Sequence, residues 1–214
     1  MKKAAIAFAL IAAVTAVAVS VAGAKSHKAA TVAAGPSCKS VTIGTMGPYT
    51  GPVASIGLDQ LHWAQFYVDR WNANPKNKMK VKLVQLDSQL DPSKASTLAQ
   101  KAASNSAMVA MIGPSGSQEV IAASPILKKA GMAFVSSSAT RTSLTDGSLA
   151  GLFFRVVPKD DDQGATIATY LTSKLGVGSG DKVLDIDNQN AYSTGLSDTV
   201  DKNLKAKGIT VDRE

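Results

Sequence analysis

Short apolar runs alternate with amphipathic segments along most of this chain, and this alternation limits the folds available to it. Runs typical of buried strands lie at 41–46, 80–86, 108–112, 132–136, 152–157, 182–187 and 208–213. Apolar residues spaced three and four apart predict helices at 57–73, 93–105, 118–130, 161–175 and 194–207. Strands that alternate with helices predict β–α–β units and a parallel sheet. The expected fold class is therefore α/β, a parallel sheet with flanking helices.

Individual residues sharpen the helix predictions. In 57–73, the residues expected on one buried face are Leu61, Ala64, Val68 and Trp71. A proline inside a helix removes a backbone hydrogen bond, so Pro125 is expected to kink or split the segment 118–130.

The N-terminal residues are not expected to belong to the fold. Lys2 and Lys3 precede an almost wholly apolar stretch that ends in a small-residue cleavage motif, so residues 1–24 are predicted to be a secretory signal peptide. An uncleaved membrane anchor is the alternative, because the apolar run is nearly long enough to span a bilayer. Residues 25–40 are predicted to be a flexible leader. The single cysteine, Cys38, excludes an internal disulfide.

The remaining chain is predicted to form two unequal lobes. Residues 41–157 are expected to form a complete first α/β lobe, and residues 158–214 the start of a second one with only two strands. So small a unit buries little surface. We therefore expect either that the natural chain continues beyond Glu214 or that the sequence is a fragment.

Small hydroxyl residues follow two successive predicted strands. MIGPSGS at 111–117 and VSSSAT at 135–140 place six hydroxyls near one sheet edge: Ser115, Ser117, Ser136, Ser137, Ser138 and Thr140. Parallel α/β sheets bind ligands beyond the carboxyl ends of their strands. The first-turn N–H groups of the helix near 118 suit a carboxylate. Singly, each serine could instead be a helix cap or turn former; together they predict a site for a small polar molecule.

The sequence offers little for catalysis, for metal or cofactor binding, or for nucleic acid. Ser115 lies in a near match to a nucleophile elbow, but no histidine follows it to act as base. The loop 44–51 could mimic a phosphate cradle, but its prolines make it longer and stiffer than that motif needs. The acidic run 160–162 is expected to be a solvated first helical turn rather than a cation site. The net charge of +7 is spread over dispersed lysines, not the clustered patch typical of nucleic-acid binding.

Six segments together resemble periplasmic solute-binding proteins of the leucine/isoleucine/valine type, which serve ABC importers. They are IGTMGPYTGPVASIG (43–57), LVQLDSQLDP (83–92), MIGPSGSQEV (111–120), VSSSATRTSLT (135–145), FFRVVPKDDDQGATIA (153–168) and AYSTGLS (191–197). The resemblance runs in order through 41–214, and the segment from Arg155 to Gly164 is its most specific part.

The resemblance implies a type I periplasmic-binding fold in which two lobes close on a ligand. Ser117 matches a serine that holds the ligand carboxylate, while Ser138, Ala139 and Thr140 match positions that contact the carboxylate and ammonium. Tyr192 matches an aromatic residue that closes over the ligand. Ile56 stands where relatives often place a larger ligand-contacting side chain. Leu90 and Gly116 occupy positions that form a disulfide in some relatives.

The expected function is therefore extracytoplasmic capture of an amino acid or similar small polar solute and its delivery to an ABC permease. The protein is expected to be periplasmic or secreted, to meet membranes only through its signal segment or the permease, and to catalyse no reaction. Hinge residues are expected near 156–160. Two alternatives stay open: a ligand-sensing ectodomain of the same fold, and a periplasmic serine hydrolase that uses Ser115.

Overall fold

The computed structural model describes residues 38–147 and 151–214. The predicted signal peptide, 1–24, and most of the predicted leader lie outside these residues. In chain order the elements are β1 (Ser40–Gly47), α1 (Ala54–Ala73), β2 (Lys80–Asp87), α2 (Pro92–Ala103), β3 (Met108–Ile112), α3 (Ser117–Lys129), β4 (Ala133–Ser136), the 3₁₀ helix η1 (Thr142–Thr145), β5 (Phe153–Arg155), α4 (Asp160–Ser173), β6 (Lys182–Asp185), α5 (Ala191–Lys205) and β7 (Thr210–Arg213). The predicted α/β alternation is confirmed.

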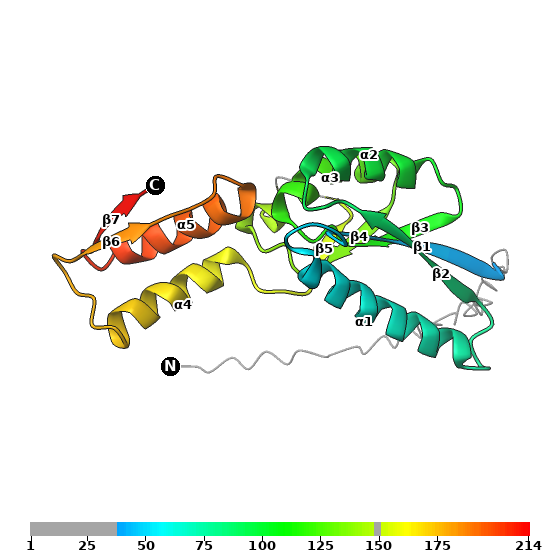
Figure 1. Cartoon of the computed structure of the whole chain (residues 1–214), viewed down its shortest axis with the longest axis horizontal. Helices are drawn as coiled ribbons and strands as arrows, with labels where there is room; N and C mark the ends of the chain where they lie inside the picture. Colours follow the sequence, from blue (N-terminus) through cyan, green and yellow to red (C-terminus); the bar gives the residue numbers. More distant parts are fainter. Residues whose placement is uncertain (1–37, 148–150) are drawn as a thin grey trace, which may run out of the picture. The chain divides into compact units, whose positions relative to one another are not determined.

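The strands form two separate parallel sheets. The first sheet has the order β2-β1-β3-β4-β5, and the second pairs β6 with β7. Because α–β crossovers are right-handed, the change of direction after β2 puts α1 on one face of the first sheet and α2 and α3 on the other (Figure 1). The carboxyl ends of its strands lie at one edge, where the loops after the neighbouring strands β1 and β3 lead to helices on opposite faces of the sheet.

The two faces of the first sheet differ in how well they are covered. Two rows run in register across β3, β4 and β5: Met111–Phe134–Phe153 and Ile112–Val135–Phe154. The first row is buried in the main core against α2 and α3, whereas Phe154 at the end of the second row is 56% exposed. Parallel sheets are normally covered on both faces. Among the described helices only α1 covers the second face, where it packs against β1 and β2 (Figure 1).

The predicted stripe on α1 is wrong at one residue. Leu61 is buried and Ala64 and Val68 are half-buried, as expected, but Trp71 is 44% exposed. Asn72 turns inward instead, where its amide donates to the Val81 carbonyl and accepts from the Val81 N–H. A polar side chain that joins helix to strand therefore takes the place expected for the indole.

The prediction that Pro125 splits its helix is also wrong. α3 runs unbroken from Ser117 to Lys129. Ala123 and Leu127, on either side of Pro125, are fully buried in the main core. Tertiary packing of these neighbours compensates for the hydrogen bond that the proline cannot make.

The second sheet rests on a small core of its own. Ala168, Val200, Leu204 and Ile209 are buried where α4 and α5 pack against the β6–β7 pair. The two helices approach closely at Gly164, where a Cβ atom would lie 2.0 Å from the Thr199 hydroxyl oxygen. α5 begins at Ala191, earlier than the predicted 194, because the Asn190 side chain accepts hydrogen bonds from the backbone N–H groups of Tyr192 and Ser193.

Candidate functional site

A hollow of about 440 Å³ lies at the carboxyl edge of the first sheet. It is also lined by residues of α4, of α5 and of the loop after β6, which surround the second sheet. Its lining from the first region is Pro48, Val53, Ile56, Leu90, Ser115, Gly116, Ser117, Gln118, Ser138 and Thr140, and from the second Gln163, Asn188, Asn190 and Tyr192. This volume is in the range of small-molecule sites. Five of the six predicted ligand-binding residues, all but Ala139, line this hollow.

Ser117 is the first residue of α3 and is almost completely buried. Its hydroxyl oxygen accepts a hydrogen bond from the Arg141 N–H at 3.2 Å, which joins the loop after β3 to the loop after β4. The Glu119 carboxylate accepts from the Gly116 N–H at 2.6 Å and so fixes the turn that leads into the helix. The Glu119 N–H donates to the Gly116 carbonyl at 3.1 Å. The N–H groups of the two residues before it, Ser117 and Gln118, open the helix and suit an anionic group in the hollow.

Glu119 is a fully buried carboxyl directly behind this turn. Burial raises its pKa above the usual value, and the Ser88 hydroxyl and the Gly116 N–H partly offset that effect. The nearby carboxylates of Asp87 and Asp91 raise the pKa further. The floor of the turn therefore holds a carboxyl group that resists ionisation.

The loop after β4 is held by Ser136. Its hydroxyl donates to the Pro114 carbonyl at 2.6 Å and accepts from the N–H groups of Ser138 and Ala139. Ala139 is buried and does not line the hollow, so its side chain supports the loop. The Thr140 hydroxyl oxygen is also buried. It faces the buried Asp160 carboxyl, whose pKa burial raises and the Thr140 hydroxyl partly lowers.

Arg155 anchors the same loop from β5. Its Nη1 donates to the carbonyls of Thr140 at 2.8 Å and of Arg141 at 2.9 Å, and its guanidinium also reaches Ala139 and Thr142. Burial lowers the pKa of Arg155, while the carboxylates of 160–162 act in the opposite direction. The backbone conformation of the loop is thus set by a side chain outside it.

The second sheet supplies the other side of the hollow. Tyr192 stands in the first turn of α5, 39% exposed, and its pKa is raised by burial and by the charge of Asp160. Asn188 and Asn190 follow β6, again at a carboxyl strand end. Ile56, at the start of α1, is 53% exposed and faces the hollow from the first region.

Sequence reasoning missed several of the lining residues. Gln163, Asn188 and Asn190 were not singled out as candidate ligand contacts, although the polar run 188–190 directly follows a predicted strand. Parallel sheets bind ligands beyond the carboxyl ends of their strands, and this rule, applied to the second sheet as well as the first, would have identified the run 188–190.

The six predicted hydroxyls differ in their hydrogen-bond partners and in the hollow that they line. Ser115 and Ser136 form structural hydrogen bonds, to Gln60 at 2.6 Å and to Pro114. Ser137 is exposed and lines a different hollow. Ser117, Ser138 and Thr140 line the shared hollow, and the hydroxyl of Ser117 also accepts a hydrogen bond from the Arg141 N–H. Ser115 pairs with an amide oxygen, which cannot take up a proton as a catalytic base would.

Two other loops from the sequence analysis also have structural partners. The Asp87 carboxylate accepts hydrogen bonds from the N–H groups of Tyr49 at 2.9 Å and Thr50 at 3.3 Å, so the loop 44–51 already holds an anion of its own. Of the acidic run 160–162, Asp161 and Asp162 are exposed as expected, but Asp160 is fully buried. In residues 38–147 and 151–214, no cluster of His, Cys, Asp and Glu could hold a metal ion.

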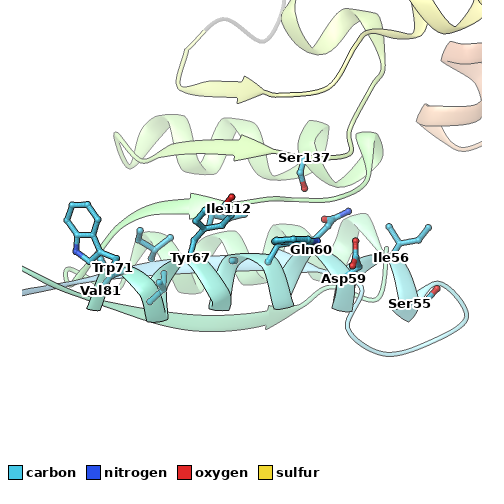
Figure 2. Close-up of a pocket in the computed structure, with 13 residues that line it drawn as sticks. Ser55, Ile56, Asp59, Gln60, Tyr67, Trp71, Val81, Ile112 and Ser137 are labelled. Carbon is cyan, nitrogen blue, oxygen red and sulfur yellow. The ribbon is translucent and has the colours of Figure 1, made fainter. Parts of the chain in front are cut away.

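A larger and more apolar hollow, about 860 Å³, lies along α1 on the incompletely covered face of the first sheet (Figure 2). Trp71 and Tyr67 of α1 border it beside Val81 and Ile112 of the sheet, and Asp59, Gln60 and Ser137 lie toward one end (Figure 2). It shares Ile56 with the smaller hollow. The smaller hollow, at the carboxyl edge with polar groups from both sheets, is the better candidate for recognising a polar solute.

Comparison with known proteins identifies the family. Residues 40–214 match the model described as periplasmic binding protein. The chain belongs to the periplasmic binding protein family. An amino acid binding protein of Pseudomonas aeruginosa is 30% identical over 170 residues, which are 79% of this chain and 44% of that protein. The Leu/Ile/Val-binding protein BraC3 of Rhizobium johnstonii is 31% identical over 173 residues, or 79% of this chain and 45% of that protein.

Solved structures of periplasmic binding proteins share the fold. The branched-chain amino acid transporter substrate binding protein LivJ of Streptococcus pneumoniae, in complex with isoleucine, is 28% identical with a TM-score of 0.71, covering 82% of this chain and 49% of that one. The leucine binding protein LivK of Thermotoga maritima gives 25% and 0.72, covering 81% and 48%. The expected type I periplasmic-binding fold and the family resemblance are confirmed. The chain spans about half the length of the relatives it matches.

None of the helices in the described ranges has the length and apolar character needed to cross a membrane. The predicted division at 157/158 and the ligand-binding roles of individual residues stay predictions.

Proposed function

We propose that this protein is an extracytoplasmic solute-binding protein that captures an amino acid or similar small polar solute between two lobes and delivers it to an ABC permease. The observation that carries the proposal is the hollow at the carboxyl edge of the first sheet, which Ser117, Ser138 and Thr140 line on one side and Asn188, Asn190 and Tyr192 on the other. Membership of the periplasmic binding protein family supports a periplasmic location, and the predicted signal peptide would bring the chain there.

The hollow suits a zwitterionic ligand. The N-terminus of α3 at Ser117 would take the ligand carboxylate through first-turn N–H groups and the helix dipole. Ser138 and Thr140 would complete that cradle and hold the ammonium group. Tyr192 would cover the ligand from the second sheet, and Ile56 would face its side chain. Ala139 would act through its backbone, because its side chain is buried behind the loop.

Closure of the two lobes is the proposed mechanism. The crossing at 156–160 is the proposed hinge, because it joins β5 of the first sheet to α4 of the second. Closing would remove the ligand from water and strengthen its hydrogen bonds. The permease would then recognise the closed form. No step in this cycle requires a covalent change, and we propose that the protein is not an enzyme.

L-isoleucine and L-leucine are the first ligands to test, because related proteins are named for binding branched-chain amino acids. Titration of the ¹⁵N-labelled chain should shift the amide signals of Ser117 and of 138–140 at millimolar ligand. Ser117→Ala or Thr140→Ala should weaken binding by about 1–3 kcal/mol, which is about 5- to 150-fold.

Ser104→Ala is the matched control, because Ser104 is an exposed serine at the end of α2, outside both hollows. It should bind like the unmodified chain. Unchanged affinity in both site variants would remove the site assignment. No amide shift near Ser117 with either amino acid would count against the ligand class.

A further inference from the structure

Arg141 is the residue that most directly joins the hydroxyl loops to the second sheet. Its backbone N–H donates to the Ser117 hydroxyl at 3.2 Å, in the wall of the candidate site. Its side chain leaves the loop and reaches α5, where Nη1 donates to the Thr194 hydroxyl at 3.0 Å and to the Ala191 carbonyl. Tyr192 lies between these two acceptors in the sequence.

The neighbouring residues leave room for this contact. Gly195 follows Thr194 in α5 and is buried. A Cβ atom at Gly195 would lie 2.9 Å from Nη1 of Arg141 and 3.0 Å from its Cγ. A side chain at position 195 would therefore press against Arg141 and force its guanidinium to shift away from the first turn of the helix.

General electrostatics does not explain an arginine at this point. A helix N-terminus carries partial positive charge, so a cation there is unfavourable. The buried carboxylate of Asp160 lies close enough for its pKa to be lowered by the Arg141 charge, although burial raises that pKa overall. Asp160 therefore offsets the repulsion, and the hydrogen bonds of Arg141 to α5 fix the geometry.

Arg155 and Arg141 form hydrogen bonds with different parts of the structure. Arg155 binds the backbone carbonyls of the loop itself and does not reach α5 in any described contact. The Nε of Arg141 also donates to the Ser143 hydroxyl at 3.1 Å, which holds the guanidinium on one side. Its guanidinium is therefore oriented before it meets α5.

We propose that Arg141 is a positioning residue that holds the first turn of α5, and with it Tyr192, over the candidate site. The ligand-related part of this inference rests on the proposed function, whereas the placement of Tyr192 does not. Loss of the Arg141 side chain should free the first turn of α5 and leave the first sheet intact, because Arg155 still anchors the loop.

The first experiment needs no ligand. The chain contains four tyrosines, so labelling with 3-fluorotyrosine and ¹⁹F NMR gives a signal for each, and Tyr192→Phe identifies the signal of Tyr192. Arg141→Ala and Gly195→Ala should both move that signal toward the position of an exposed tyrosine. Combining them should add little, because both remove the same contact. Arg141→Lys should restore part of the shift.

Arg70→Ala is the control, since Arg70 is an exposed arginine of α1 that lies over Phe66. It should leave the Tyr192 signal unchanged. The inference is overturned if the Tyr192 signal is the same in Arg141→Ala, Gly195→Ala and the unmodified chain.

A second experiment links the contact to binding. Arg141→Ala should weaken binding of L-isoleucine about tenfold, within the coupling range of contacting residues. In a Tyr192→Ala background the same change should have little effect, a dependence that general loss of stability would not produce. An equal loss in both backgrounds would overturn the positioning role. If no variant binds isoleucine but the Tyr192 signal moves as expected, the proposed ligand class fails and the placement of Tyr192 stands.

Discussion

The two sheets are built from the same β–α–β units, yet they depend on very different amounts of packing. The first sheet shares a continuous core with α2 and α3 that includes Met111, Phe134 and Leu127. The core beside the second sheet has four buried apolar residues, which come from α4, α5 and the turn before β7, and Leu184 on β6 is 55% exposed. Burial of apolar surface is the main stabilising term. The comparison teaches that the first sheet can carry the site's hydroxyl loops by itself, whereas the second depends on a few helix contacts.

The largest expected effect on stability comes from two fully buried leucines, one in each core. Leu127→Ala and Leu204→Ala remove the same group, each at a cost of about 2–5 kcal/mol. Leu127→Ala should lower the stability of the whole folded chain in urea. Leu204→Ala should raise amide exchange in α5, β6 and β7, because its core has little else to compensate. Hydrogen exchange with mass spectrometry measures both. Equal loss of protection in β1 and β3 after Leu204→Ala would show one cooperative unit and break the comparison.

A smaller effect is expected where α4 and α5 touch. Gly164→Ala would place a methyl group 2.0 Å from the Thr199 hydroxyl and push the helices apart, a cost of about 1–3 kcal/mol. The same exchange measurement should show faster exchange in α4 and α5, with β1 to β4 unchanged. Gly178→Ala is the matched control, because its Cβ would meet an ordinary contact at 3.9 Å. Similar exchange in the two variants would mean that the helices adjust without cost.

The smallest expected effect is on the pH dependence of folding stability and comes from Glu119 in the first region. Its pKa is raised in the folded state by burial, so the folded chain holds this proton more tightly than the unfolded chain does. The stability that this gives is present below the ordinary pKa of 4.5 and is lost as pH rises through the folded pKa. Glu119→Gln should flatten that decline in urea unfolding measured over a pH series. Glu214→Gln, at an exposed position, should keep the slope of the unmodified chain; if Glu119→Gln keeps it too, the carboxyl is not the cause.

Local patterns predicted the order of strands and helices and the edge that carries the site. Those features depend on periodicity and on the rule for parallel sheets, which act over short stretches of chain. The failures arose where distant residues decide. Asn72 replaces Trp71 on the buried face because its amide forms hydrogen bonds with the carbonyl and N–H of Val81 in β2. Pro125 is tolerated because Ala123 and Leu127 on either side of it pack in the main core.

The candidate site shows the same limit at the level of single side chains. By residue type alone, six hydroxyls near one edge are equivalent. The family resemblance singled out Ser117, Ser138 and Thr140, and the structure adds the hydrogen-bond partners that separate Ser115 and Ser136 from them. Ser136 and Ser138 cannot be told apart by residue type, but in the structure the Ser136 hydroxyl donates a hydrogen bond to the Pro114 carbonyl. Asp160 looked like its two solvated neighbours, but the loop at Thr140 and the helix α5 close around it.

The way Arg155 holds its loop has a consequence for how such a protein can change its specificity. The guanidinium binds backbone carbonyls at four successive positions, 139–142, and every residue type has a carbonyl there. Side chains at 138 and 140 could therefore be exchanged during evolution, or in a designed library, while the loop keeps its path. One anchor outside the loop would let many different sets of side chains be tried at the proposed site on one scaffold.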